Sequence, residues 1–323
     1  MMDKRTRVLN AMDGKPVDRV PVGFWHHFTK EQVDGPAAAK SHLDFYRESG
    51  IDMLKIMSDG ISFEFPGAME KASDWARVRP NGSQSDFVQG SVERAKRIKD
   101  ELKDECCLFY NIFAPFSLVR FYAGDDRVMA HVREDRRPLM DAMAAIAEDN
   151  AELVRRLITE AGCDGVYISV QGGEINRFSA EEYEEIVMPS DLPALVSANE
   201  VSDYNIFHMC GYDGVRNHLE VWKKYPARVY NWAVYIENIT LSQGRSYLKP
   251  KADCILGGFD NRKHGMLYRG SKEEICAETR RLLDDAGTVG TMLGADCTIP
   301  MDIPLEHLRW VVETAEEYGN GNS

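Results

Sequence analysis

Short hydrophobic runs alternate with amphipathic segments along the chain. Each run is rich in valine, isoleucine, leucine or aromatic residues, a composition typical of β-strands that are buried on both faces. The runs occupy residues 20–25, 52–57, 108–113, 165–170, 204–209, 229–234, 254–259 and 290–294. The pattern therefore predicts eight buried strands with helical segments between them.

The segments between the runs carry signals for helices. A three-to-four spacing of apolar residues predicts a helix over residues 143–161, with Gly162 as its C-terminal cap. Residues 179–182 (Ser-Ala-Glu-Glu) and 271–274 (Ser-Lys-Glu-Glu) have the pattern of capping boxes that open helices. Pro304 fits the first turn of a last helix.

Strands that alternate with helices predict a parallel sheet covered by helices. Eight such strands in a chain of 323 residues predict an α/β fold, a single (β/α)8 TIM-type barrel. We expect residues 1–323 to form this one domain, with a short N-terminal extension. An open, doubly wound sheet is the alternative, but no glycine-rich dinucleotide-binding loop follows an early strand.

Composition and charge exclude several classes of function. The net charge is −13 and the chain has no basic stripe, so a general nucleic-acid-binding protein is not expected. No apolar stretch reaches about 18 residues and none follows the charged N-terminus, so neither a membrane span nor a secretory signal is expected. The odd number of cysteines, seven, argues against a disulfide framework. We therefore expect a cytoplasmic protein.

A histidine and a cysteine stand two residues apart at the end of the fifth run. Alternate residues of a strand share a face, so His208 and Cys210 can both point into the barrel mouth, where the active sites of such barrels lie. Cys297 follows the eighth run and reaches the same end of the barrel. Imidazole nitrogen and cysteine sulfur bind zinc, and a catalytic zinc keeps three protein ligands and one open position. We predict a zinc site at these three residues; the alternative is that they belong to the core.

Three further segments resemble one known family. Residues 114–118 (Ala-Pro-Phe-Ser-Leu) look like its Ala-Pro-Phe-Thr-Leu segment after the third strand, and residues 160–166 look like the Ala-Gly-Ala-Asp segment before its fourth strand. Residues 299–306 resemble its Pro-x-x-Thr-Pro-x-Glu turn into the last helix. On these motifs, most of the chain resembles the uroporphyrinogen decarboxylase superfamily, whose members fold as (β/α)8 barrels.

That superfamily has a decarboxylase branch and a branch that moves methyl groups to or from corrinoid proteins, as in methylcobamide:coenzyme M methyltransferases and O-demethylase components. The second branch carries a His-x-Cys…Cys zinc motif, which His208, Cys210 and Cys297 match. The resemblance implies a zinc-dependent methyltransferase that works with a corrinoid and a small-molecule methyl donor, or with a thiol or folate acceptor. The chain has no Asp-x-His-x-x-Gly signature of a cobalamin-binding module, so the corrinoid would belong to a separate partner protein.

The decarboxylase branch fits less well. Its substrate carries many carboxylates, which need arginine partners, whereas residues 23–30 after the first run contain no arginine. The late Gly-His-Gly of that branch is Gly-Ala-Asp here, at residues 294–296. Asp59 does occupy the position of the aspartate with which that branch grips its substrate. We predict that Asp59 acts in the catalytic site; the alternative is a turn residue after the second run.

Other polar residues that follow predicted strands are candidates for the pocket. His26 and His27 follow the first run and Gln171 follows the fourth, and we predict that they contact substrate; a surface or core histidine is the alternative for the first two. Asp260 is a further substrate candidate, in a Gly-Gly-Phe-Asp-Asn segment that departs from the family's Gly-Asn-x-x-Pro and leaves the substrate open. Glu174 is a candidate general base or fourth metal ligand; the alternative is a loop charge.

Two other functions agree with the same residues. One is a metal-free lyase that acts on a carboxylate other than uroporphyrinogen. The other is a non-catalytic barrel with a structural metal, in which Glu174 or another carboxylate fills the fourth ligand position. In a methyltransferase, zinc would either hold an acceptor thiol as its thiolate or polarise a methyl donor. Metal content separates the lyase from the other two functions.

Overall fold

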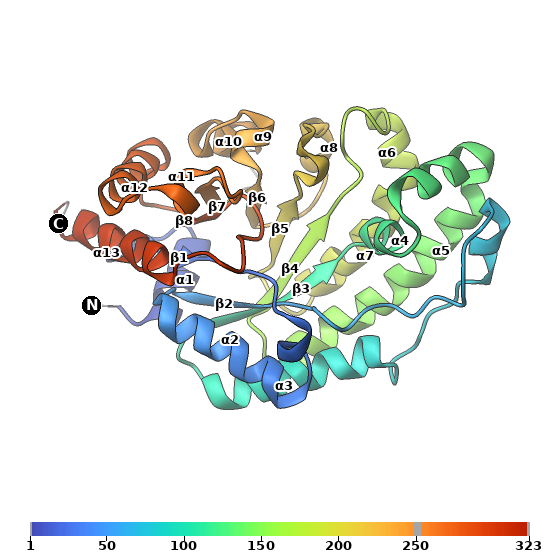
Figure 1. Cartoon of the computed structure of the whole chain (residues 1–323), viewed down its shortest axis with the longest axis horizontal. Helices are drawn as coiled ribbons and strands as arrows, with labels where there is room; N and C mark the ends of the chain where they lie inside the picture. The colour runs from blue at the N-terminus through green and yellow to red at the C-terminus, as the bar shows by residue number, and fades with distance from the viewer. Residues whose placement is uncertain (1, 249–252, 322–323) are drawn as a thin grey trace.

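Within residues 2–248 and 253–321, which the computed structural model describes, eight strands form one sheet. The strands are β1 (Val22–Gly23), β2 (Met53–Ile56), β3 (Cys107–Phe113), β4 (Gly165–Val170), β5 (Ile206–Met209), β6 (Val229–Trp232), β7 (Cys254–Phe259) and β8 (Thr291–Ala295). Their order is β1-β8-β7-β6-β5-β4-β3-β2, and every adjacent pair is parallel. A backbone hydrogen bond from Asp52 to Val22 (2.8 Å) joins the two ends of this order, so the barrel nearly closes. The predicted (β/α)8 fold is confirmed (Figure 1).

Each predicted hydrophobic run overlaps one observed strand, although β3 begins one residue before its run and β8 ends one residue after its run. β4 and β7 begin and end at the residues that the sequence pattern indicates. β1 is shorter than predicted at both ends: it begins after Pro21, which has no N–H to add to the ladder, and it ends at Gly23. Every strand residue except Phe113 is buried. This burial on both faces explains why the runs are continuously hydrophobic and do not alternate with polar residues.

Helices surround the strands (Figure 1). In the described residues they are α1 (Lys4–Met12), α2 (Gly35–Ser49), α3 (Ser91–Leu102), α4 (Pro115–Ala123), α5 (Asp125–Thr159), α6 (Ala180–Ile186), α7 (Met188–Asn199), α8 (Leu219–Trp222), α9 (Val234–Glu237), α10 (Leu241–Leu248), α11 (Met266–Arg269), α12 (Lys272–Ala286) and α13 (Leu305–Gly321). Both predicted capping boxes are present, with Ser179 and Ser271 accepting from backbone N–H groups three residues later. The predicted cap Gly162 lies two residues beyond the observed C-cap of α5, Glu160. No helix in these ranges is long and apolar enough to cross a membrane.

The N-terminal helix α1 closes the bottom of the barrel. Its Val8, Ala11 and Met12 belong to the same buried cluster as the inward-facing residues of β2, β3, β7 and β8. Arg7 of this helix pairs with the fully buried Asp52 just before β2 (2.9 Å). The segment that the sequence predicts as an extension is therefore the floor of the barrel. The carboxyl ends of the strands form the opposite, open end, where barrel enzymes place their active sites.

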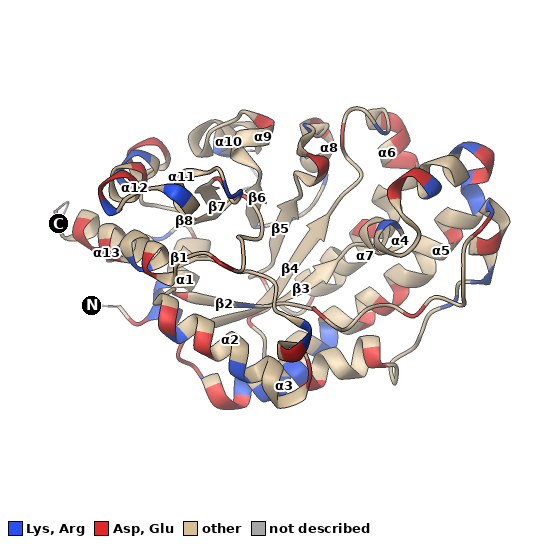
Figure 2. Ribbon diagram, in the orientation of Figure 1, with Lys and Arg blue, Asp and Glu red and all other residues tan. Residues whose placement is uncertain are grey.

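Charged side chains lie mainly on the helices and loops around the barrel (Figure 2). Lys55 in β2 is the exception, because no other lysine, arginine, aspartate or glutamate lies within the eight strands. A charge in the wall of a barrel is costly to bury unless other groups compensate it. The surroundings of Lys55 are therefore informative about the site at the open end.

A buried carboxyl group lies on the outer face of the barrel, in α7. The hydroxyls of Tyr183 and Tyr225 both donate to Oδ2 of Asp191, at 2.8 and 2.9 Å. Burial raises the pKa of Asp191 to about 7, although these two hydrogen bonds lower it. The folded-state pKa thus lies above the ordinary value of 3.8. This group contributes stability at low pH, and that contribution is lost as the pH rises through the folded-state pKa.

We predict that Asp191→Asn reduces the pH dependence of stability, because the amide keeps an acceptor for the two tyrosines and removes the titration. Between about pH 4 and about pH 7.5, the urea midpoint of the wild type should fall by more than that of the variant. The exposed Asp203 offers a control, and Asp203→Asn should follow the wild-type profile. Parallel profiles for the wild type and Asp191→Asn would contradict the assignment.

Candidate metal centre

The three predicted metal ligands meet at the open end of the barrel. His208 lies in β5, Cys210 follows directly after β5, and Cys297 lies two residues beyond β8. Their ligand atoms all lie within 4.8 Å of one another, and the two sulfurs are 4.0 Å apart. His208 and Cys210 are buried, and Cys297 is half-buried. The structure thus brings together the residues that the sequence places at two strand ends, while metal binding itself stays a prediction.

Backbone pairing beyond the strand ends positions the two cysteines. The N–H of Cys210 donates to the carbonyl of Val170 (3.1 Å), so the chain stays extended after β5. Extended geometry keeps Cys210 on the same face as His208. On the other side, the N–H of Asp296 donates to the last residue of β7 (2.8 Å) and carries Cys297 to the mouth.

One buried amide sets the tautomer of His208. Nδ1 of His208 lies 2.5 Å from Oδ1 of Asn231, and the amide of Asn231 donates to the carbonyls of Leu256 (2.8 Å) and Ala295 (3.2 Å). With its N–H groups used in this way, Asn231 presents only its oxygen to the histidine, so Nδ1 carries the proton. The hydroxyl of Tyr167 donates to the same oxygen (2.7 Å). Nε2 of His208 is therefore the atom with a lone pair, and it is buried without a hydrogen-bond partner.

This arrangement fits a zinc ion. Two sulfurs bound to one tetrahedral zinc at about 2.3 Å each lie about 3.8 Å apart, which matches the 4.0 Å separation of Cys210 and Cys297. The unpartnered Nε2 of His208 supplies the third donor, and Asn231 is the kind of partner that orients metal-binding histidines. Within the described ranges, the group of potential ligands contains these three residues. A tetrahedral ion held by them would keep one position open.

The two thiols differ in acidity. The hydrogen bond between the two sulfurs lowers the pKa of Cys297, and His208 and Lys55 lower it further against the effect of burial. The same hydrogen bond, together with burial, raises the pKa of Cys210. The amide of Gln171 donates to the sulfur of Cys210 (3.8 Å) and opposes this rise.

Lys55 lies in the wall of the barrel close to these groups. Its side chain is 4% exposed, and its ammonium lies 3.5 Å from the ring centroid of Tyr167 and 4.5 Å from that of Trp25. The Tyr167 ring lies in turn 5.3 Å from the His208 ring. Burial lowers the pKa of Lys55 to about 7, while the charges of Cys297 and Cys210 raise it.

Glu174 belongs to a buried ion-pair cluster. Its two oxygens lie 3.0 Å from Nη1 of Arg120 and 3.1 Å from Nε of Arg177. Asp125 and Asp213 pair with the same arginines. The cluster joins the loop after β4 to α4 and to the loop after β5, and Glu174 is fully buried within it. Its predicted role as a general base or fourth metal ligand stays a prediction, which this geometry does not support.

Asp59 and His27 join the loops after β2 and β1. Asp59 accepts from Nδ1 of His27 (2.7 Å) and from the N–H of Phe28 (2.9 Å). Burial raises the pKa of Asp59, but these hydrogen bonds outweigh it and the pKa is lowered overall. His26 faces the carbonyl of His27 (2.6 Å) and pairs by its backbone with Ile299, two residues after Cys297. Contact of these three residues with substrate remains a prediction.

The other two predicted substrate residues differ in position. Gln171 lies against the thiols, as its hydrogen bond to Cys210 shows, and its Oε1 is buried without a partner. Asp260 instead forms a short-range ion pair with Arg262 (2.8 Å) and faces His264 (3.6 Å) within its own loop. The structure therefore places Gln171 beside the candidate centre, whereas Asp260 pairs with Arg262 and His264 in its own loop.

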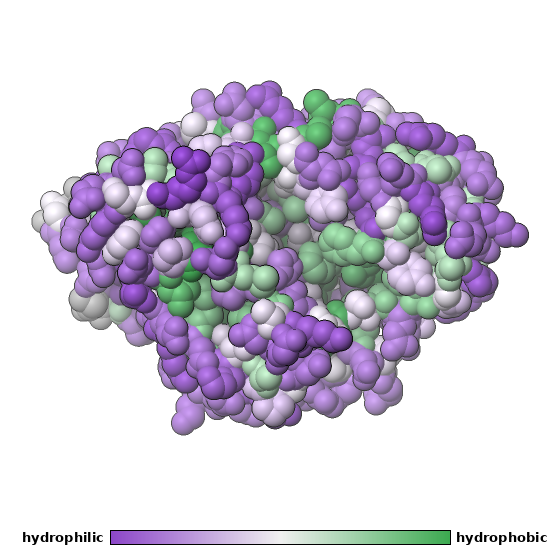
Figure 3. Space-filling model, viewed as in Figure 1, coloured by the Kyte–Doolittle hydropathy of each residue, from purple (hydrophilic) through white to green (hydrophobic). Residues whose placement is uncertain are grey.

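A cleft of about 290 Å³ opens over the ends of β2 and β3. Aromatic side chains dominate its lining, and Asp59 is its one charged residue. The aromatic residues are Phe63, Phe65, Phe113, Phe121 and Tyr122. Figure 3 shows apolar residues within the hollow of this face. The cleft thus offers apolar surface on the same side of the barrel as the thiols.

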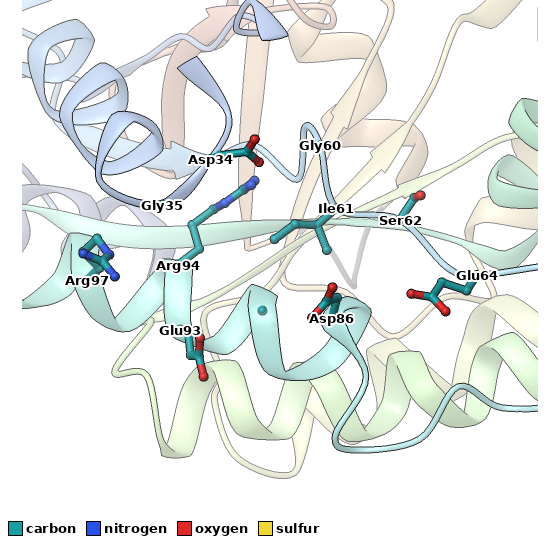
Figure 4. Close-up of a pocket in the computed structure, with 11 residues that line it drawn as sticks. Asp34, Gly35, Gly60, Ile61, Ser62, Glu64, Asp86, Glu93, Arg94 and Arg97 are labelled. Atoms are coloured by element: carbon teal, nitrogen blue, oxygen red, sulfur yellow. The ribbon is translucent and has the colours of Figure 1, made fainter. Parts of the chain in front are cut away.

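A neighbouring cavity of about 400 Å³ lies between the start of α2, the loop after β2 and α3 (Figure 4). Charged side chains of both signs line it. Arg94 reaches from α3 toward the loop of Asp34 and donates to the carbonyls of Met57 (2.9 Å) and Val33 (2.5 Å). Its guanidinium therefore holds two loops together. The cavity contains none of the residues predicted for the site.

The sequence interpretation missed Asn231, Tyr167 and Lys55. Each lies inside a hydrophobic run, where it resembles an ordinary strand residue. The sequence did contain a signal for two of these residues. A lysine or an asparagine that is buried in an otherwise apolar strand needs hydrogen-bond or charge partners. A search of the runs for lysine and asparagine would have identified Lys55 and Asn231, together with Asn111 and Asn205.

We predict that zinc binding depends on both the ligands and Asn231. Cys297→Ala should abolish stoichiometric zinc, and Asn231→Ala should weaken zinc affinity by about 10- to 100-fold, because the histidine loses its orienting partner. Competition with a chromophoric chelator measures both effects. Cys276→Ala and Asn199→Ala, in helices away from the mouth, are the matched controls. Equal zinc content and affinity in all variants would refute the assignment.

Comparisons with known proteins show which family and which solved structures this chain resembles. A family model described as uroporphyrinogen decarboxylase (URO-D) matches residues 3–318. The solved structure of a methyltransferase from Methanosarcina mazei is similar to this chain, with a TM-score of 0.77 and 17% identity over 98% of this chain and 99% of that one. A B12-independent methionine synthase from Shewanella sp. W3-18-1 has a TM-score of 0.51 and 13% identity, with 95% of each chain covered.

No curated protein sequence matches this chain. At such low identities the two solved structures show the fold, which agrees with the eight-stranded barrel. The family model is more specific, because it spans nearly every residue from the floor helix α1 to the last helix α13. This chain therefore belongs to the uroporphyrinogen decarboxylase family.

Proposed function

We propose that this protein is a zinc-dependent methyltransferase that moves a methyl group between a corrinoid on a partner protein and a small molecule. The observation that carries the proposal is the group of His208, Cys210 and Cys297, whose ligand atoms lie within 4.8 Å at the open end of the barrel. Family membership and the likeness to the methyltransferase from Methanosarcina mazei support an enzymatic role.

Zinc held by these residues would bind an acceptor thiol as its thiolate, or would polarise the leaving group of a methyl donor. Residues of this chain orient and stabilise the donor atoms around the proposed metal position. Asn231 keeps the proton on Nδ1 of His208 and leaves Nε2 free. Gln171 donates to the sulfur of Cys210 and stabilises negative charge there. Burial of the group excludes bulk water, which strengthens every electrostatic contact.

The aromatic cleft is the proposed place for the body of the small molecule. Its volume of about 290 Å³ suits a compact ligand. Asp59 lies at its edge, held by His27 and the backbone of Phe28. A polycarboxylate such as uroporphyrinogen has no cationic partner in this cleft, because no lysine or arginine lines it. The lining therefore supports a smaller and less anionic substrate.

Exposed apolar residues at the mouth support docking of a partner protein. Most of the large apolar side chains that are exposed in the described ranges follow strands and therefore reach the open end. They are Phe121 and Tyr122 after β3, Ile175 after β4, Tyr212 after β5, Tyr235 after β6, Met266 after β7 and Met301 after β8. Exposed apolar and aromatic residues of this kind mark interaction surfaces. A corrinoid protein docked on this rim would present its cofactor to the metal position.

The alternative of a structural metal needs a fourth protein ligand. Within the described ranges, the ligand group has three members, and both oxygens of Glu174 pair with arginines. This favours a site with an open position over a closed one. The alternative of a metal-free lyase has no observation of its own in its favour.

We predict methyl transfer that requires the three ligands. Under anaerobic conditions, free methylcobalamin with thiol or folate acceptors, and cob(I)alamin with methoxy-aromatic or methylamine donors, test both directions by their visible spectra. Activity should disappear in His208→Ala and Cys210→Ala and persist in Cys276→Ala, with circular dichroism confirming that each variant is folded. Full activity of the ligand variants, or no spectral change with any donor or acceptor when the cognate corrinoid protein is supplied, would overturn the proposal.

We predict that the apolar rim recognises the partner and not the free cofactor. Ile175 is 53% exposed and Met301 is 56% exposed, and both follow strands. The double variant Ile175→Ser, Met301→Ser should raise KM for the corrinoid protein by roughly fivefold or more, because apolar contacts at the interface are lost. KM for free methylcobalamin should stay the same. Val289→Ser is the matched control, since Val289 is 50% exposed but precedes β8 at the closed end. An unchanged KM for the partner in the double variant would exclude the rim.

A further inference from the structure

Lys55 has an unusual environment for a lysine. It lies in β2 between Met53 and Met57, which point to the same inner face and belong to the apolar cluster inside the barrel. Its ammonium lies over the faces of Trp25 and Tyr167, at 4.5 and 3.5 Å from the ring centroids. In the part of the chain that the structure describes, no carboxylate forms an ion pair with it.

Packing does not explain this charge. A methionine at position 55 would match its two neighbours on the inner face, and burying an ammonium is unfavourable unless other groups compensate it. The two aromatic faces compensate part of the cost through cation–π attraction. Cys297, Cys210 and Asp59, in that order, raise the pKa of Lys55. The compensation that the two thiols supply in the metal-free protein would be lost once zinc neutralised their charge.

We propose that Lys55 is a specificity-determining residue whose positive charge makes the open position of the metal centre select an anionic ligand. This inference rests on the proposed function. The charges of zinc and two thiolates would cancel, and the imidazole of His208 is neutral, so Lys55 in its protonated form would give the centre one positive charge. An anionic fourth ligand neutralises the whole group, whereas a neutral ligand leaves a buried charge uncompensated.

Ring contacts relate the ammonium to the candidate centre. The ammonium lies 3.5 Å from the ring centroid of Tyr167, and that centroid lies 5.3 Å from the ring centroid of His208. The tyrosine hydroxyl donates to Asn231 and offers no acceptor bond to the lysine. Lys55 therefore acts on the centre through its field. The chemical class selected is a ligand that binds through an anionic atom, such as a thiolate, with the proton of a thiol released to solvent.

The test measures ligand binding and not turnover. Cobalt(II) in place of zinc gives visible bands that shift when a ligand enters the open position. Azide is the anionic probe and imidazole is the neutral probe, titrated into the wild type, Lys55→Met and Lys55→Gln. Both variants should bind azide more weakly than the wild type by about tenfold or more, with imidazole affinity changed by less than about twofold. Lys272→Met, at an exposed position in α12, is the control and should behave as the wild type.

The outcomes separate this inference from the proposed function. A wild-type protein that takes up no cobalt overturns the proposed metal centre and this inference with it. Variants that hold cobalt and bind azide as tightly as the wild type overturn the role of Lys55 alone. An equal loss of azide and imidazole binding also overturns it, because such a loss indicates a change of shape and not of charge. If both variants fail to fold, Lys55 is a structural residue and the inference is wrong.

Discussion

The side chain of Asn231 is the contact on which the candidate centre depends. It is fully buried, and its two N–H groups are used by the carbonyls of Leu256 and Ala295 on β7 and β8. Its oxygen is thereby turned to Tyr167 and His208 on β4 and β5. One amide in β6 therefore links five strands and fixes the proton position of the histidine. A buried hydrogen-bond network of this kind specifies a single arrangement, because every alternative leaves a polar group unsatisfied.

The barrel separates structural charges from functional ones. At the closed end, Asp52 receives hydrogen bonds from Arg7 and Arg19 and ties the floor to the wall. At the open end, Glu174 and its arginines fix the loops around the mouth. The candidate ligands His208, Cys210 and Cys297 belong to neither network, and charge on the two thiols raises the pKa of Lys55. A low-dielectric site with so few charges responds strongly to each one.

Membership of the family does not by itself define the reaction, because one barrel supports many chemistries through its loops. The differences from a decarboxylase of a polycarboxylate lie at the mouth. The cleft there is lined by aromatic residues and by Asp59, without a lysine or arginine. Around it stand exposed apolar side chains such as Phe121 and Met301. These features are the ones on which the proposed small substrate and protein partner rest.

The sequence by itself determined the fold class and the meeting of the three ligands. Eight hydrophobic runs predict the barrel, the period of two in a strand places His208 and Cys210 on one face, and barrel geometry brings Cys297 beside them. Only the tertiary structure decided that Glu174 is held by arginines, that Asn231 contacts His208 and that Lys55 lies over the ring of Tyr167. The physical reason is that local patterns give the direction of a side chain. Its partner comes from another strand or helix, and the free energy of a buried polar group depends on that partner.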